Sequence, residues 1–99
     1  MTASTFDTLA EAKARIASEK KATRAAQAAL YAARLDALRE RYRDAFGQCA
    51  DGERTACARH LFAAAAIFER DARHFPSRIR KAIAQMELAV FMLAGKVRP

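Results

Sequence analysis

The segment AFGQCADGERT, residues 45–55, decides the fold because it contains the first helix breakers of the chain. No glycine or proline precedes Gly47, and the surrounding sequence is rich in alanine, leucine, arginine, lysine and glutamate, which favour helices. Asp51-Gly52 is a turn dipeptide, and Asp51 or Thr55 is suited to cap a following helix. The segment therefore predicts a turn that folds a long first helix back onto a second.

Upstream of this turn we expect one helix over about residues 8–46. Thr8 and Glu11 have the spacing of a capping box, and Ser4 is the alternative cap. At the other end, Gly47 is expected to close the helix in the left-handed conformation.

The apolar pattern of this first helix changes midway. Its second half carries a stripe with the spacing of a buried face: Tyr31, Leu35, Leu38, Tyr42 and Phe46. In the first half Leu9, Ile16 and Leu30 recur at multiples of seven residues, with small or polar residues between them. This weaker series suits an alanine-type coiled-coil seam with a partner or a partly exposed arm, and the pattern leaves both interpretations open.

Downstream of the turn, two shorter helices are expected, over about residues 53–72 and 77–94. Pro76 separates them and suits the first turn of a helix, where Ser77 is a possible cap. On the second helix the expected buried face consists of Cys57, Leu61, Ala64, Phe68 and Ala72, widened by Phe62, Ala65 and Ile67. On the third it consists of Ile79, Ile83, Met86, Val90 and Leu93.

The third helix has a second apolar face near its end, formed by Leu88, Phe91 and Met92. A helix that is apolar nearly all round is buried on both sides. Packing against the first helix is one explanation, and we prefer self-association of two chains through these three residues. The sequence therefore predicts an all-α fold, a long helical hairpin with a third helix packed back, that forms a homodimer.

Length and charge narrow the class of protein. The chain has 99 residues and a net charge of +7, which predicts one small helical domain over residues 1–99. A basic balance favours acidic partners, although solubility alone is the alternative explanation. The first residues lack the basic and apolar regions of a secretory signal, and no stretch is apolar enough to span a membrane, so we expect a cytoplasmic protein.

Basic residues form two groups. One contains Lys20, Lys21 and Arg24, and the other contains Arg70, Arg73, His74, Arg78, Arg80 and Lys81. Antiparallel return of the chain would bring both groups to one end of the bundle, where the amino end of the third helix adds its positive dipole and free amides. The predicted partner-binding residues are Lys20, Lys21, Arg24, Arg73, Arg78, Arg80 and Lys81.

Motifs for chemistry are missing. The chain has no phosphate-binding glycine loop, no nucleophile elbow and no zinc-protease helix motif, so we expect neither an enzyme nor a cofactor. Cys49, Cys57 and His60 supply three candidate ligands without a fourth, so we expect no metal, and Cys57 is interpreted as a small core residue.

These observations favour a non-enzymatic interaction protein whose basic end docks on an acidic protein or nucleoprotein partner. An adaptor, an assembly factor or an inhibitor of the kind encoded by phages and mobile elements fits such a chain. Direct nucleic-acid binding is the first alternative, since the second and third helices resemble a helix-turn-helix that lacks the usual turn glycine. A purely structural oligomerisation module is the second alternative.

Overall fold

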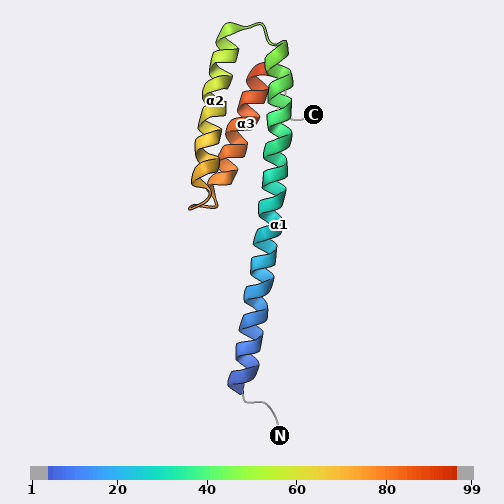
Figure 1. The fold of residues 1–99 in the computed structure, drawn as a ribbon, viewed down its shortest axis with the longest axis vertical. Coiled ribbons are helices and arrows are strands. Elements are labelled where there is room, and N and C mark those ends of the chain that lie inside the picture. The colour runs from blue at the N-terminus through green and yellow to red at the C-terminus, as the bar shows by residue number, and fades with distance from the viewer. Residues whose placement is uncertain (1–4, 96–99) are drawn as a thin grey trace. The chain divides into compact units, whose positions relative to one another are not determined.

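The computed structural model describes the backbone of residues 5–95 and the side chains of residues 8–95, and this part of the chain is helical without any strand. Three helices follow one another: α1 Thr5–Gln48, α2 Gly52–Asp71 and α3 Arg78–Ala94 (Figure 1). The predicted all-α fold with three helices is confirmed.

Contacts divide the chain into two compact units, Met1–Leu30 and Tyr31–Pro99, and helix α1 runs through both. The expected single domain over residues 1–99 stays a prediction.

The second unit is an up-down-up arrangement of the end of α1, all of α2 and all of α3 (Figure 1). The ring of Tyr42 on α1 stacks on that of Phe62 on α2, with 4.7 Å between ring centroids. Three residues earlier on α1, the Arg39 guanidinium forms an ion pair with Glu69, which lies seven residues later on α2. Earlier residues of α1 therefore meet later residues of α2, which confirms the predicted antiparallel return within this unit.

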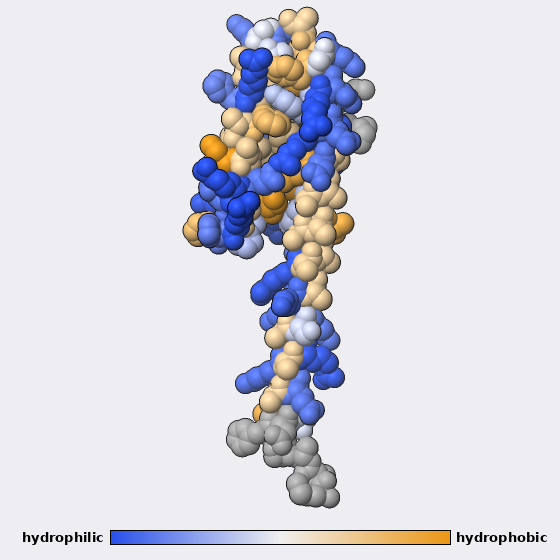
Figure 2. Space-filling model, in the orientation of Figure 1, coloured by the Kyte–Doolittle hydropathy of each residue, from blue (hydrophilic) through white to orange (hydrophobic). Residues whose placement is uncertain are grey.

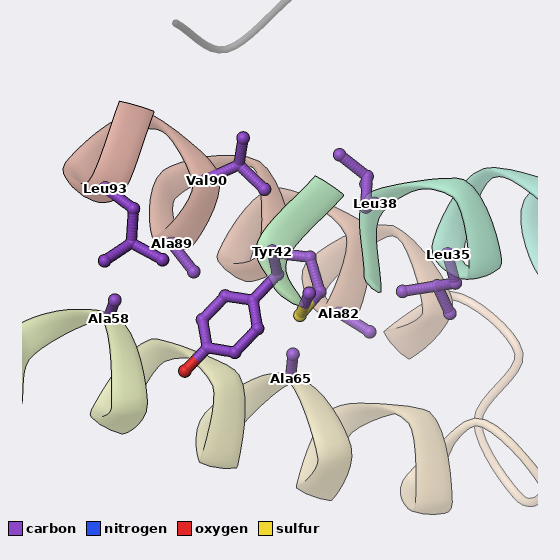
Figure 3. Close-up of a cluster of buried hydrophobic side chains, with 10 residues drawn as sticks. Leu35, Leu38, Tyr42, Ala58, Ala65, Ala82, Ala89, Val90 and Leu93 are labelled. Atoms are coloured by element: carbon purple, nitrogen blue, oxygen red, sulfur yellow. The ribbon is translucent and has the colours of Figure 1, made fainter. Parts of the chain in front are cut away.

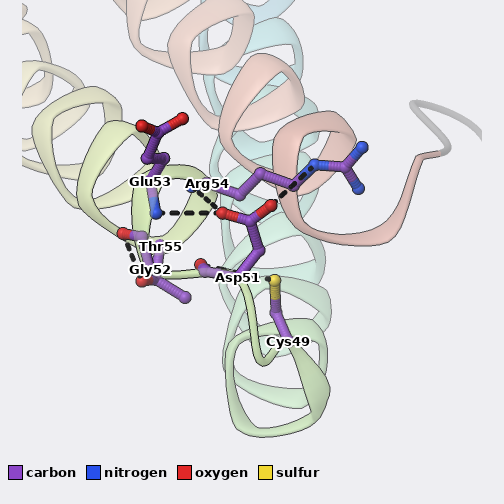
Figure 4. A network of polar contacts seen from close by, with 6 residues as sticks. All are labelled: Cys49, Asp51, Gly52, Glu53, Arg54 and Thr55. Atoms are coloured by element: carbon purple, nitrogen blue, oxygen red, sulfur yellow. Dashed lines mark hydrogen bonds and ion pairs between the residues drawn. The ribbon is translucent and has the colours of Figure 1, made fainter.

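The turn between α1 and α2 is built around Asp51, as the sequence predicts (Figure 4). One carboxylate oxygen of Asp51 accepts hydrogen bonds from the amides of Glu53 and Arg54, at 2.9 and 3.0 Å. These two amides have no partner inside the helix, so the side chain satisfies groups that the helix start leaves open. The hydroxyl of Thr55, the other candidate cap, donates instead to the carbonyl of Gly52.

The ends of α1 differ from the prediction. Thr8 lies inside the helix, which already begins at Thr5, and the alternative cap Ser4 lies outside the described residues. Gly47 also lies inside the helix, and the described glycine with positive φ is Gly95, at 70°. A glycine costs a helix only about 1 kcal/mol, which is too little to end α1 before the residues that start the turn.

The core of the second unit is small and rich in alanine (Figure 3). Its buried side chains are Leu35, Leu38 and Tyr42 from α1, Ala58 and Ala65 from α2, and Ala82, Met86, Ala89, Val90 and Leu93 from α3. The alanines are spaced seven residues apart on α2 and again on α3, and these two helices are the pair in closest backbone contact. Since alanine ends at Cβ, this pairing lets the two backbones approach closely.

The expected stripes on α1 and α3 are largely confirmed, and so is part of the expected face of α2, where Ala65 is buried and Leu61 and Phe68 pack against the core. Cys57 is exposed and Ile67 is half exposed, whereas Ala58 and Ala65 are buried. The prediction that Cys57 is a core residue is wrong. It followed the large apolar residues, whereas the buried residues of α2 are alanines.

The phenol ring of Tyr42 is buried in the core. Its ring points toward α2 between Ala58 and Ala65 (Figure 3). Burial raises the pKa of Tyr42 above its ordinary 10.0, and the positive charge of Arg59 opposes part of this rise.

The first unit is a helical segment whose described side chains, residues 8–30, are exposed except for the half-buried Ala12. Its large apolar residues Leu9, Ile16 and Leu30 are 50, 50 and 69% exposed. Figure 2 shows hydrophilic side chains alternating with weakly hydrophobic ones along this unit. The predicted weak apolar series is therefore not covered within its own unit.

Candidate partner-binding surface

The end of α2, the following turn and the start of α3 form one strongly basic segment, which we call the basic turn, residues 69–81. It contains five arginine and lysine side chains against two carboxylates, a net charge of +3, together with His74. Figure 2 shows hydrophilic side chains gathered at the end of the second unit where this turn lies.

The backbone of the basic turn is held by hydrogen bonds between nearby peptide groups. The amides of His74 and Phe75 both donate to the carbonyl of Asp71, at 3.0 and 2.9 Å. The amide of Arg78 donates to the carbonyl of Phe75 at 2.9 Å, and Pro76 between them fixes its own φ. These hydrogen bonds hold the backbone between α2 and α3 in one compact turn.

Four basic side chains of this turn have no carboxylate within ion-pair distance among the described residues: Arg73, Arg78, Arg80 and Lys81. Three of them instead contact aromatic groups. The Arg78 guanidinium lies 5.9 Å from the centre of the Phe75 ring, Lys81 Nζ lies 5.8 Å from that of Phe68, and Arg80 Nε donates to the Tyr31 hydroxyl at 3.2 Å. These contacts orient the cations and leave their charge uncompensated.

Both acidic side chains of the turn are already engaged. Glu69 pairs with Arg39 of α1, and Asp71 lies 4.0 Å from the neighbouring Arg70. Within the second unit, the carboxylates closest in sequence therefore do not neutralise the four arginine and lysine side chains described above.

One part of the predicted site is wrong. The amino end of α3 was expected to offer free amides, but those of Arg78, Ile79 and Arg80 donate to the carbonyls of Phe75, Pro76 and Ser77. Ser77 has helical backbone angles and makes no side-chain cap, so the preceding turn itself satisfies these amides. Any attraction for anions at this end has to come from side chains.

The predicted site residues fall into both units. Arg73, Arg78, Arg80 and Lys81 lie together in the basic turn. Lys20, Lys21 and Arg24 belong to the first unit, where each is exposed, and their convergence with the other four stays a prediction.

Sequence reasoning did not single out Phe75, the aromatic residue of the basic turn. Its side chain is 61% exposed, and it is flanked by His74 and the exposed Pro76. The signal for it was a phenylalanine-proline pair inside a turn, where no helical face is available to bury the ring.

The three predicted self-association residues differ in exposure. Leu88 and Phe91 are 47 and 45% exposed, on the side of α3 away from the core, while Met92 packs partly buried against the core. Self-association through this face stays a prediction.

The cysteines and the surface depressions are other places where a ligand could bind. Cys49 and Cys57 are free thiols, and the described residues contain no group of three side chains placed to hold a metal ion. Two open depressions of about 460 Å³ each are found; one is lined by Glu69, Arg70 and Arg73 at the basic turn, and the other lies between the ends of α1 and α3.

In comparisons with known proteins, no family model, curated protein or solved structure matches this chain significantly. Among the described residues, no helix combines the length and the apolar character that crossing a membrane requires.

Proposed function

We propose that this chain is a non-enzymatic interaction protein that docks its basic turn on an acidic face of a partner protein, either free or within a nucleoprotein complex. Arg73, Arg78, Arg80 and Lys81 make the central contacts, and Lys20, Lys21 and Arg24 extend them. Its role is that of an adaptor, an assembly factor or an inhibitor, of the kind that phages and mobile elements encode, and it acts in the cytoplasm.

The observation that carries the proposal is the uncompensated charge of the basic turn. Four cations, Arg73 in the loop and Arg78, Arg80 and Lys81 in the first turn of α3, have no carboxylate partner in the described part of the chain. Elsewhere in the second unit, arginines such as Arg34 and Arg39 are paired with carboxylates of other helices. Complementary charge on a partner would speed association and fix its orientation.

An acidic protein is favoured over bare nucleic acid because of Phe75. Protein interfaces are enriched in arginine and aromatic residues, and a few such residues supply most of the binding energy. A ring that is 61% exposed among arginines on an ordered loop matches this composition. Contacts to a duplex backbone would use the charges alone.

The proposal is tested by affinity capture from the native host, with two variants of equal net charge. Arg78→Glu with Arg80→Glu reverses the charge of two residues in the basic turn. Arg43→Glu with Arg59→Glu reverses the charge of two exposed arginines outside it. Both lower the net charge from +7 to +3, so general charge effects are the same.

We expect one partner to be lost with the first variant and kept with the second, with unchanged helicity by circular dichroism. Equal loss with both variants would show that only net charge matters. Retention on duplex DNA that decreases with salt, without any protein partner, would favour direct nucleic-acid binding instead.

The homodimer is a separate part of the proposal, with Leu88, Phe91 and Met92 in its interface. Sedimentation of the wild-type chain is expected to give a dimer, and Leu88→Ser with Phe91→Ser a monomer. A monomeric wild-type chain at high concentration would remove this part and leave the docking proposal intact.

A further inference from the structure

The exposed apolar residues of the first unit follow a heptad. With Leu9 at position a, the a and d positions up to residue 30 are Leu9, Ala12, Ile16, Glu19, Thr23, Ala26 and Leu30. We call these seven residues the amino-terminal seam. In a coiled coil, residues at a and d form the contact with a partner helix.

Several observations mark the seam as an unpartnered face. Its three large aliphatic side chains are at least half exposed. The Thr23 hydroxyl donates a hydrogen bond to the backbone carbonyl of Glu19 at 2.9 Å. Its proton is therefore satisfied within the helix and needs no acceptor from a partner helix. The series also loses its large aliphatic residues at the second unit, where the next d and a positions are the exposed Ala33 and Ala37 and the following d position is the exposed Glu40.

The residues that flank the seam determine which partner fits. Positions e and g carry Lys13, Arg15 and Lys20 as their charged residues between 8 and 30, and all three are exposed. No ion pair joins them to a carboxylate in the described part of the chain. Charges at e and g set partner choice and orientation in coiled coils.

A second copy of the chain fits poorly. In a parallel pair, Arg15 at g would face Lys20 at e of the other copy, and the two Glu19 side chains would meet at d. In an antiparallel pair, e faces e and g faces g, which again places lysine beside lysine. Like charges in both orientations act against self-pairing.

We propose that the amino-terminal seam binds an acidic amphipathic helix of another protein, with aliphatic residues facing Leu9, Ile16 and Leu30 and carboxylates flanking them. The seam contains no residue of the basic turn and does not depend on the function proposed for that turn, although Lys20 beside the seam is also among the residues that the proposed function uses. This proposal assigns the amino-terminal half of α1 to partner recognition.

A synthetic peptide of about four heptads tests this directly. Its a and d positions are leucine and its e and g positions glutamate, and a matched peptide has lysine at e and g. Binding of each labelled peptide to the full chain is measured by fluorescence anisotropy, and helix formation on mixing by circular dichroism.

The acidic peptide is expected to bind with a gain in helicity, and the lysine peptide not to bind. Leu9→Ser with Ile16→Ser should weaken binding about a hundredfold, the scale of two aliphatic side chains leaving an apolar interface. Ala14→Ser with Ala17→Ser, which lie at positions f and b, should leave it unchanged.

Reversal of the flanking charges, Lys13→Glu with Arg15→Glu and Lys20→Glu, keeps the aliphatic residues and should transfer binding to the lysine peptide. Equal binding of both peptides to the wild-type chain would overturn the proposal. So would a wild-type dimer that Leu9→Ser with Ile16→Ser dissociates.

The basic turn provides the remaining control. Arg78→Glu with Arg80→Glu should leave binding of the acidic peptide unchanged, so failure of this inference and of the proposed function can be told apart. Loss of peptide binding in that variant would place the peptide on the basic turn and refute the seam.

Discussion

Replacing Ala65 by leucine tests whether the core is packed closely around the alanines of α2. The side chain of Ala65 is 3% exposed and lies in the core beside the ring of Tyr42 (Figure 3). Leucine adds three carbon atoms for which this contact has no room. Overpacking of this kind costs about 1–3 kcal/mol.

A loss of this size is large for the second unit. At about 0.05–0.15 kcal/mol per residue, a unit that spans residues 31–99 has a free energy of unfolding of about 3–10 kcal/mol. One kcal/mol shifts the melting temperature of a domain this size by about 4–8 °C. Ala65→Leu should therefore lower it by roughly 4–24 °C.

The assay is thermal and urea unfolding followed by circular dichroism, with Ala63→Leu as the matched control. Ala63 lies on the same helix and is exposed, so the same substitution should change stability by less than about 0.5 kcal/mol. Equal stability of the two variants would refute the close alanine contact.

Three further predictions concern the turns and Tyr42. Asp51→Ala removes the acceptor of two amides and should cost about 1 kcal/mol in urea unfolding, while Asp51→Asn should keep most of the stability; no loss in the alanine variant would contradict the cap. In the same urea unfolding assay, Gly47→Ala should stabilise the chain by about 0.5–1 kcal/mol, because Gly47 is helical and a Cβ there meets no atom within 4 Å. Gly95→Ala should destabilise it by about 1 kcal/mol, because φ at Gly95 is 70°. A change of stability with the same sign in both variants would be evidence against these conformations. The folded chain holds the Tyr42 proton more tightly than the unfolded chain, because burial raises the pKa of this phenol. Its contribution to the free energy of unfolding is therefore complete below pH 10.0 and is lost as the pH rises through the higher pKa of the folded chain. Tyr42→Phe should lack this loss, and subtracting its ultraviolet phenolate titration from that of the wild type should give a midpoint above 10.0.

Much of the fold follows from local chemistry that a sequence displays. The Asp51-Gly52 turn and the stripe around Leu38 on α1 depend on residues close together in the chain. They were predictable because capping and helical spacing act within a few residues.

The buried face of α2 was harder to predict. Cys57 and Ile67 have larger and more apolar side chains and were expected to be buried, yet the buried residues of α2 are Ala65, which was expected, and Ala58, which was not. Which face is buried depends on how closely a second helix approaches, and the seven-residue spacing of alanine on both helices was the available signal.

The candidate site was predicted in part. Clustering of Arg73, Arg78, Arg80 and Lys81 follows from their short separation in sequence. Whether each cation has a carboxylate partner depends on side chains from other helices, as the pairing of Glu69 with Arg39 illustrates, and the free amides expected at α3 were lost to carbonyls of the preceding turn.

The central claim is that the uncompensated positive charge of the basic turn binds an acidic partner. The most direct test is the salt dependence of the dissociation constant for the captured partner, measured for the wild-type chain, for Arg78→Glu with Arg80→Glu, and for Arg43→Glu with Arg59→Glu. Affinity should fall steeply with salt for the wild type and for the second variant, and much less for the first. The same salt dependence for all three chains would contradict the claim.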